Sequence, residues 1–107
     1  MTLSTGPSLE NKIAVVTGAG SGMGLATILA FVREGATVYA LDISQDNLDR
    51  ELGDQPQVTA IALDIADSAA VNQAFGRVRE DHGRLDVLIN AAGVNTPNRR
   101  ATEWLDG

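Results

Sequence analysis

The sequence predicts an α/β fold built on a doubly wound parallel sheet, and three observations support this prediction. Short apolar runs alternate with longer segments in which apolar residues recur at helical spacing. Polar residues end four of these runs, at Thr17, Asp42, Asp64 and Asn90, at intervals of 25, 22 and 26 residues. The chain has 107 residues, 44% of them hydrophobic, which suits one domain of four strands and three helices.

The first strand and helix are the most clearly patterned elements. Residues 13–16 form a continuous apolar run that is typical of a strand buried on both faces of a parallel sheet. A helix is expected over 23–34, because apolar residues recur there every three or four positions. Gly35 then fits a helix end that needs a positive φ.

The remaining elements repeat this alternation of strand and helix. Two side chains are expected to cap helices, Ser44 at the second helix and Asp67 at the third, which ends at Gly83. The expected elements are a strand over 38–41, a helix over 44–52, a strand over 58–63, a helix from Asp67 to Gly83 and a strand over 85–89.

The sheet is expected to be truncated after its fourth strand. Doubly wound sheets usually need further strands and helices to cover the second face. We therefore interpret residues 1–11 as a polar leader and residues 12–107 as an incomplete domain from a longer protein.

A glycine-rich loop separates the first strand from the first helix. It matches the spacing T-G-x-x-x-G-x-G, whereas a strict G-x-G-x-x-G does not fit. Glycines let the backbone turn sharply and approach a ligand, and the following helix directs its free N–H groups at the loop. The loop therefore predicts a pyrophosphate site at Thr17-Gly18-Ala19-Gly20-Ser21-Gly22-Met23-Gly24.

Asp42 ends the second strand and is expected to select the nucleotide. A carboxylate there can accept hydrogen bonds from the adenosine ribose and would repel a 2′-phosphate. Ile43 follows it, so no neighbouring Arg neutralises such a phosphate. We therefore predict NAD rather than NADP as the cofactor; the alternative is an Asp that only begins a turn.

Two further strand ends border the same expected crevice. Asp64-Ile65 either contacts the cofactor or begins the loop before the Asp67 cap. The small residues of Asn90-Ala91-Ala92-Gly93 would let a cofactor lie against backbone, and Asn90 could instead tie neighbouring strands together.

Composition excludes several other functions. The chain has no cysteine and a single histidine, His82, so neither a disulfide framework nor a Cys- or His-based metal site is expected. The net charge of -6 argues against nucleic acid as a partner. We find no secretory signal and no apolar run near the roughly 20 residues that span a bilayer, so we expect a soluble cytoplasmic protein that does not bind membranes.

Together these segments resemble the short-chain dehydrogenases/reductases. The loop of residues 17–24 looks like the cofactor motif of that family, and Asp42 resembles its NAD-selecting acid. Asp64-Ile65 is similar to its adenine-side pair, and Asn90-Ala91-Ala92-Gly93 is similar to its Asn-Asn-Ala-Gly turn, with Ala in place of the second Asn. The resemblance covers roughly residues 9–95.

The resemblance implies a Rossmann-type fold and hydride transfer between an alcohol or ketone substrate and NAD(H). It also implies a homo-oligomer for the longer protein, and a catalytic Ser with a Tyr-x-x-x-Lys motif. The chain has one tyrosine, Tyr39, and one lysine, Lys12, and these do not form that motif. We therefore assign cofactor residues and no catalytic residue.

Two alternatives remain open. One is a non-catalytic dinucleotide-binding module that kept only the cofactor pocket. The other is an S-adenosylmethionine-dependent methyltransferase, which also uses a glycine loop and an acid after the second strand. Val16-Thr17 stands where such enzymes generally carry an acid, which argues against the second alternative.

Overall fold

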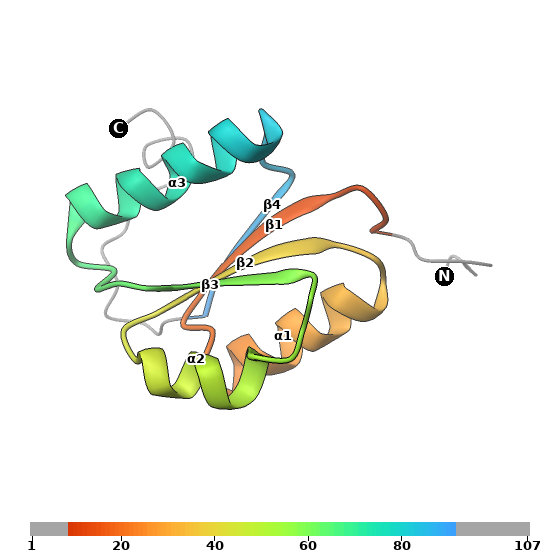
Figure 1. Cartoon of the computed structure of the whole chain (residues 1–107), viewed down its shortest axis with the longest axis horizontal. Coiled ribbons are helices and arrows are strands. Elements are labelled where there is room, and N and C mark those ends of the chain that lie inside the picture. Colours follow the sequence, from red (N-terminus) through yellow and green to blue (C-terminus); the bar gives the residue numbers. More distant parts are fainter. Residues whose placement is uncertain (1–8, 92–107) are drawn as a thin grey trace.

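The computed structural model describes residues 9–91, which form a parallel sheet with helices on both faces (Figure 1). The strand order is β3-β2-β1-β4, and every neighbouring pair is parallel. This arrangement confirms the predicted α/β, Rossmann-type architecture. The elements are β1 (Ile13–Thr17), α1 (Gly22–Arg33), β2 (Thr37–Asp42), α2 (Gln45–Leu52), β3 (Val58–Ala62), α3 (Ser68–His82) and β4 (Val87–Asn90).

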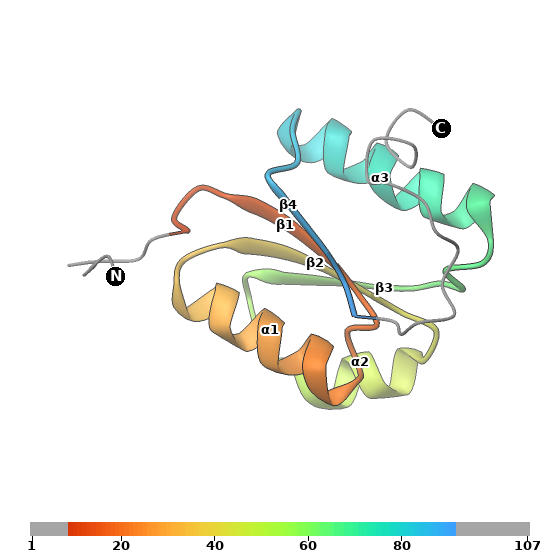
Figure 2. The same cartoon turned by 180° about the vertical axis from the view of Figure 1, so that it is seen from behind.

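The two central strands, β1 and β2, are buried on both faces, which explains their continuous apolar runs, whereas the edge strands β3 and β4 are only partly buried. In β1, Ile13 and Val15 belong to the core on the α3 side, whereas Ala14 and Val16 belong to the core beneath α1 and α2. Successive side chains of a strand point to opposite faces, so both sets must be apolar. Figures 1 and 2 show α1 and α2 on one face of the sheet and α3 on the other.

Side-chain caps begin all three helices. Ser44 accepts a hydrogen bond from the Asn47 N–H, and Asp67 accepts one from the Ala70 N–H, so both predicted caps are confirmed. The structure adds a third cap, at Ser21, for α1. Each cap satisfies a backbone N–H that the helix itself leaves without a partner.

Glycines with positive φ follow two of the helices; the sequence predicted this for Gly35 and predicted only the helix end for Gly83. Gly35 follows α1 with a φ of 93°, and Gly83 ends α3 with a φ of 74°. These values lie in the left-handed region, where a Cβ is unfavourable.

The fourth strand begins at Val87 rather than at the predicted Leu85. The Asp86 carboxylate accepts hydrogen bonds from the Ile13 N–H at 2.8 Å and from Arg84 at 3.1 Å. The bond from Ile13 is the main reason that the pKa of Asp86 lies below its ordinary value. Regular pairing of β4 with β1 therefore starts one residue later, at Val87.

Leu9, in the segment before β1, packs against the body of the domain. The Leu9 N–H donates to the Glu34 carbonyl at 2.9 Å, and the Lys12 N–H donates to the Leu9 carbonyl at 2.9 Å. The Leu9 side chain packs against the core beneath α1 and α2. These contacts attach the segment before β1 to the end of α1.

Tyr39 joins the sheet to the end of α3. It lies in β2, is 2% exposed, and donates a hydrogen bond to Asp81 at 2.7 Å. Its ring meets His82 edge-on, with 5.7 Å between the ring centroids. Burial, helped by the bond to Asp81, raises the pKa of Tyr39 from 10.0 to about 12, because both favour the neutral phenol.

This environment predicts a loss of stability in strong alkali. Between pH 10 and 12 the unfolded chain has released the tyrosine proton while the folded chain retains it, so the free energy of unfolding falls as the pH rises. Tyr39 is the only tyrosine, so tyrosinate absorbance of the folded protein should show a midpoint near pH 12. Tyr39→Phe should remove this contribution to the pH dependence, and a midpoint near pH 10 would contradict the assignment.

Gly24 sets how closely α1 approaches the end of β1. A Cβ at this position would lie 2.1 Å from the Gly18 carbonyl oxygen and 3.1 Å from the Ala19 Cα, so backbone would have to move. At Gly22, in the same helical turn, a Cβ would meet no atom within 4 Å. The folded chain therefore requires glycine at the first position and not at the second.

Gly24→Ala should lower the free energy of unfolding by about 1–3 kcal/mol, the range for overpacking a well-packed site. Gly22→Ala is the matched control and should be neutral or slightly stabilising, because Ala restricts the unfolded chain. Urea-induced unfolding of both variants checks this. Equal denaturation midpoints for the two variants would show that the close approach at Gly24 is not a packing constraint.

Candidate functional site

The loop from Gly18 to Ser21 holds its shape through its own hydrogen bonds. Gly18 has a φ of 68°, and its carbonyl accepts bonds from the Ser21 N–H and hydroxyl at 3.1 and 2.7 Å. The Ala19 N–H donates to the Leu41 carbonyl at 3.1 Å, which attaches the loop to β2. The glycine loop is therefore held in shape by hydrogen bonds of the chain itself.

The start of α1 presents free N–H groups beside this loop. The Ser21 side chain accepts from the Gly24 N–H at 3.1 Å, and the Leu25 N–H donates to the Ser21 carbonyl at 2.8 Å. The N–H groups of Gly22 and Met23 donate to no residue in the described part of the chain. Two adjacent free donors at a helix N-terminus suit an anionic group, and the open space at Gly22 leaves room for it.

The Asp42 carboxylate lies against the glycine loop. Its Oδ2 accepts from the Gly20 N–H at 2.7 Å, and its Oδ1 accepts from the Ser44 N–H at 3.0 Å. A carboxylate has about four acceptor sites, so these two bonds leave Asp42 able to accept hydrogen bonds from a ligand. A Cβ at Gly20 would lie 2.9 Å from Oδ2, which explains the glycine there.

The end of β3 carries the second predicted acid. Asp64 Oδ1 accepts from the Ala66 N–H at 2.9 Å, and the Asp64 carbonyl accepts from the Asp67 N–H at 2.9 Å. Asp64 therefore shapes the loop before α3, which was one of the two roles expected for it. It also lines the cavity described below, so both roles are compatible.

Asn90 ties β4 to β1. The buried Thr17 hydroxyl donates to Asn90 Oδ1 at 2.9 Å, and the Ala91 N–H donates to the Thr17 carbonyl at 3.0 Å. The bond joins two side chains on neighbouring strands. Ala92 and Gly93 lie outside the described residues.

A cavity of about 270 Å³ lies at the carboxyl ends of the strands. Its lining includes Thr17 and two leucines, Leu41 and Leu63, that were not predicted as site residues. The only sequence signal for the two leucines is their position at the ends of their strands. Gly20, Gly22, Met23, Gly24 and Asn90 do not line it. The predicted site residues that do are Gly18, Ser21, Asp42, Ile43, Asp64, Ile65 and Ala91.

The chemistry of the cavity suits the adenosine end of a dinucleotide. Ile43 and Ile65 provide apolar walls, and Ile43 is 71% exposed, an unusual state for a large apolar side chain. Asp42 and Asp64 add hydrogen-bond acceptors. The volume is slightly below the roughly 300–1,000 Å³ of pockets for drug-sized ligands, so it accommodates part of a dinucleotide rather than the whole.

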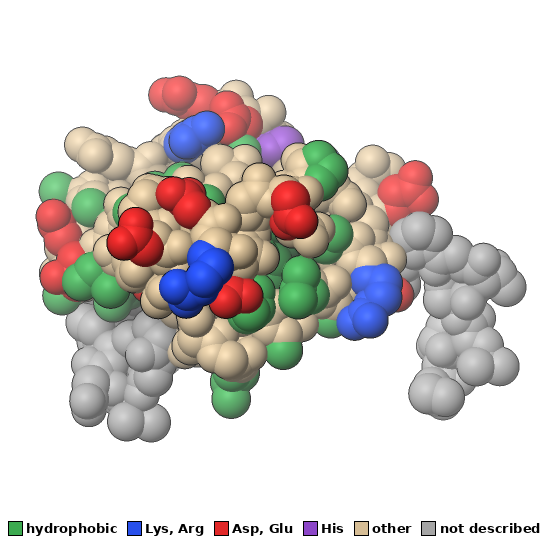
Figure 3. Space-filling model, turned by 60° about the horizontal axis from the view of Figure 1, so that its bottom comes forward, with side chains coloured by type: hydrophobic (Ala, Val, Ile, Leu, Met, Phe, Trp, Pro, Cys, Tyr) green, Lys and Arg blue, Asp and Glu red, His purple; other side chains and the backbone are tan. Residues whose placement is uncertain are grey.

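Side chains of several types are mixed on the face of the molecule that carries α1 and α2. The face formed by α1 and α2 carries acidic, basic and apolar side chains without one dominant basic patch (Figure 3). Within residues 9–91, no cluster of three or more His, Cys, Asp or Glu residues could hold a metal ion. No helix in that range is long and apolar enough to cross a membrane.

Comparison with curated proteins shows relatives among oxidoreductases. The chain is 43% identical over 90 residues to a 3-oxoacyl-acyl-carrier-protein reductase of Thermotoga maritima, and 41% identical over 88 residues to meso-2,3-butanediol dehydrogenase of Serratia marcescens. Each alignment covers 80% of this chain, but 37% and 35% of the relatives. The chain therefore spans little more than a third of their length.

Solved structures show the same relationship. A protein from Burkholderia xenovorans described as a short-chain dehydrogenase/reductase superposes with a TM-score of 0.74 and 34% identity, over 84% of this chain and 39% of that chain. A 3-ketoacyl-(acyl-carrier-protein) reductase from Brucella melitensis, complexed with NADH, gives a TM-score of 0.70 and 35% identity, over 76% and 34%. Residues 12–106 match the protein family described as short chain dehydrogenase, and the chain belongs to that family.

Proposed function

We propose that this chain is the cofactor-binding part of an NAD-dependent oxidoreductase that transfers hydride between NAD(H) and an alcohol or ketone. The observation that carries the proposal is a cavity bounded by the glycine loop and by the Asp42 carboxylate. Membership of the family supports it, as does the relative that was solved with NADH. Membership of the short chain dehydrogenase family also argues against the methyltransferase alternative.

The adenine, the ribose and the pyrophosphate of the dinucleotide each have a group in this chain that could bind them. Asp42 would accept hydrogen bonds from the adenosine ribose, while Ile43 and Ile65 would contact the adenine. The free N–H groups of Gly22 and Met23 would bind the pyrophosphate. When bound, the nicotinamide would supply or accept the hydride; the residues of this chain would bind and orient the cofactor.

Several properties of the longer protein follow from the same proposal. We propose a small alcohol or ketone as the substrate, a homo-oligomeric assembly, and a cytoplasmic location without nucleic-acid or membrane partners. We also propose that the segment Asn90-Ala91-Ala92-Gly93 borders the cofactor, since Ala91 lines the cavity.

The choice of NAD over NADP rests on Asp42 and can be tested with Asp42→Asn. The Asn side chain keeps an oxygen for the Gly20 or Ser44 N–H but removes the negative charge. We expect wild type to bind NADH more tightly than NADPH, because like charges brought together cost several kcal/mol. Asp42→Asn should raise NADPH affinity and reduce the ratio of NADH affinity to NADPH affinity about tenfold, which corresponds to about 1.4 kcal/mol.

Isothermal titration of both cofactors against both proteins provides the measurement. Asp67→Asn is a matched control, since Asp67 caps α3 and does not line the cavity. Equal affinities of wild type for NADH and NADPH would refute the assignment of Asp42.

Residues 1–107 alone should bind the cofactor without turning over substrate. A phenol with a pKa near 10 needs a nearby cation to act as an acid or base at neutral pH. The only tyrosine, Tyr39, is buried and bonded to Asp81, which raises its pKa. Steady formation of NADH from NAD and any alcohol, followed by absorbance, would contradict this expectation.

A further inference from the structure

Asn47 lies next to Asp42 at the glycine loop. A single point, the Cβ position built on Gly20, is 2.9 Å from Asp42 Oδ2 and 3.0 Å from Asn47 Cβ. Asn47 belongs to the first turn of α2, and its N–H donates to the Ser44 cap at 3.2 Å. The helix that begins after Asp42 therefore places a second polar side chain beside that carboxylate.

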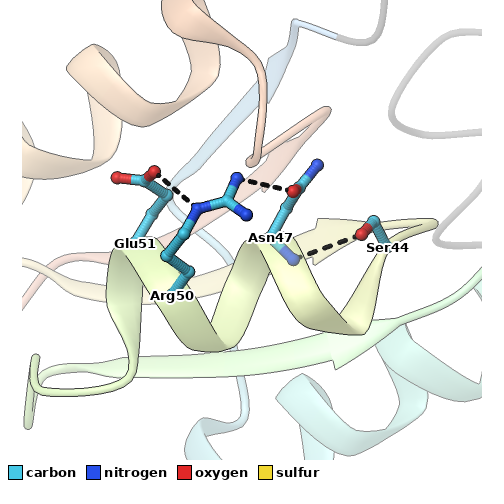
Figure 4. Close-up of polar contacts among 4 residues, drawn as sticks. All are labelled: Ser44, Asn47, Arg50 and Glu51. Carbon is cyan, nitrogen blue, oxygen red and sulfur yellow. Dashed lines mark hydrogen bonds and ion pairs between the residues drawn. The ribbon is translucent and has the colours of Figure 1, made fainter.

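The orientation of the Asn47 amide is fixed by its neighbour Arg50. Arg50 donates to Asn47 Oδ1 at 2.7 Å and to Glu51 Oε1 at 3.2 Å (Figure 4). A guanidinium has donors and no acceptors, so the group it faces must be the amide oxygen. The amide nitrogen consequently points away from Arg50, as Figure 4 shows.

The Asn47 amide nitrogen donates no hydrogen bond to any residue within 9–91. The side chain is nevertheless half-buried, and its oxygen is bonded. An oriented donor therefore lies on the side of the glycine loop where Asp42, an acceptor with free lone pairs, also lies, although Asn47 does not itself line the cavity.

We propose that Asn47 is a cofactor-binding residue that donates a hydrogen bond to the adenosine 2′-hydroxyl. This inference rests on the proposed function. A hydroxyl has one proton to donate and lone pairs that accept. Asp42 accepts the hydrogen bond that the hydroxyl donates, and Asn47 Nδ2 donates a hydrogen bond to the hydroxyl oxygen. The pair therefore satisfies the hydroxyl both as a donor and as an acceptor. Arg50 acts as a positioning residue, because it holds the amide in the required orientation.

Calorimetry with two ligands tests this pairing. The ligands are NADH and an NADH analogue whose adenosine ribose lacks the 2′-hydroxyl. Asn47→Ala keeps the Cβ that packs beside Gly20 and removes only the amide. It should weaken NADH binding about three- to tenfold, the usual value of one hydrogen bond, and leave binding of the deoxy analogue unchanged.

A second variant covers the case in which Asn47→Ala does not fold. Asn47→Asp preserves the size of the side chain and the bond from Arg50 but replaces the donor with an acceptor. It should also weaken NADH binding and leave the deoxy analogue less affected. Gln45→Ala is the control, since it removes an amide of the same helix that is bonded to Asp49; it should change neither affinity.

Arg50 gives an independent readout of orientation. Arg50→Ala should reduce the preference for NADH over the deoxy analogue, because the amide is then free to rotate. Arg50→Lys retains a donor to Oδ1 and should restore part of that preference. A purely structural contribution of Arg50 would change both affinities equally.

The outcomes separate the two proposals. If Asn47→Ala weakens NADH and the deoxy analogue equally, or weakens neither, the role of Asn47 is overturned while NAD binding stands. If the wild-type protein does not bind NADH, both the proposed function and this inference fail.

Discussion

The hydrogen bonds of the Asp42 carboxylate hold the glycine loop, β2 and α2 together. One oxygen accepts from Gly20 in the loop, and the other accepts from Ser44 at the start of α2. These bonds bring the loop against the end of β2 and leave the carboxylate facing the cavity. The same side chain thus shapes the site and serves as its main polar group, so the fold is organised around the position where we propose that the ribose binds.

The glycines of the loop divide between structure and proposed function. Gly24 is needed because a Cβ would collide with the Gly18 carbonyl, and Gly20 is needed because a Cβ would meet Asp42. Gly22 has no such neighbour, and it lies where the helix offers free N–H groups. The motif therefore combines residues that allow close packing with one that keeps space open for a ligand.

Local patterns in the sequence were enough to predict most of the architecture. Continuous apolar runs specified strands buried on both faces, and Ser44 and Asp67 marked helix starts, because these effects depend on residues close in the chain. The start of β4 was wrong by two residues, since the Asp86 side chain bonds to Ile13, 73 residues away. The hydrogen bond of Tyr39 to Asp81, and the position of Asn47 near Gly20, likewise depend on the tertiary fold.

The central claim is that an adenine dinucleotide binds between the glycine loop and Asp42, and amide NMR of the protein titrated with NADH tests it most directly. The largest shifts are expected at the N–H groups of Gly20, Gly22 and Met23, with smaller changes along β4 and α3. Shifts confined to other regions, or none at saturating NADH, would contradict it.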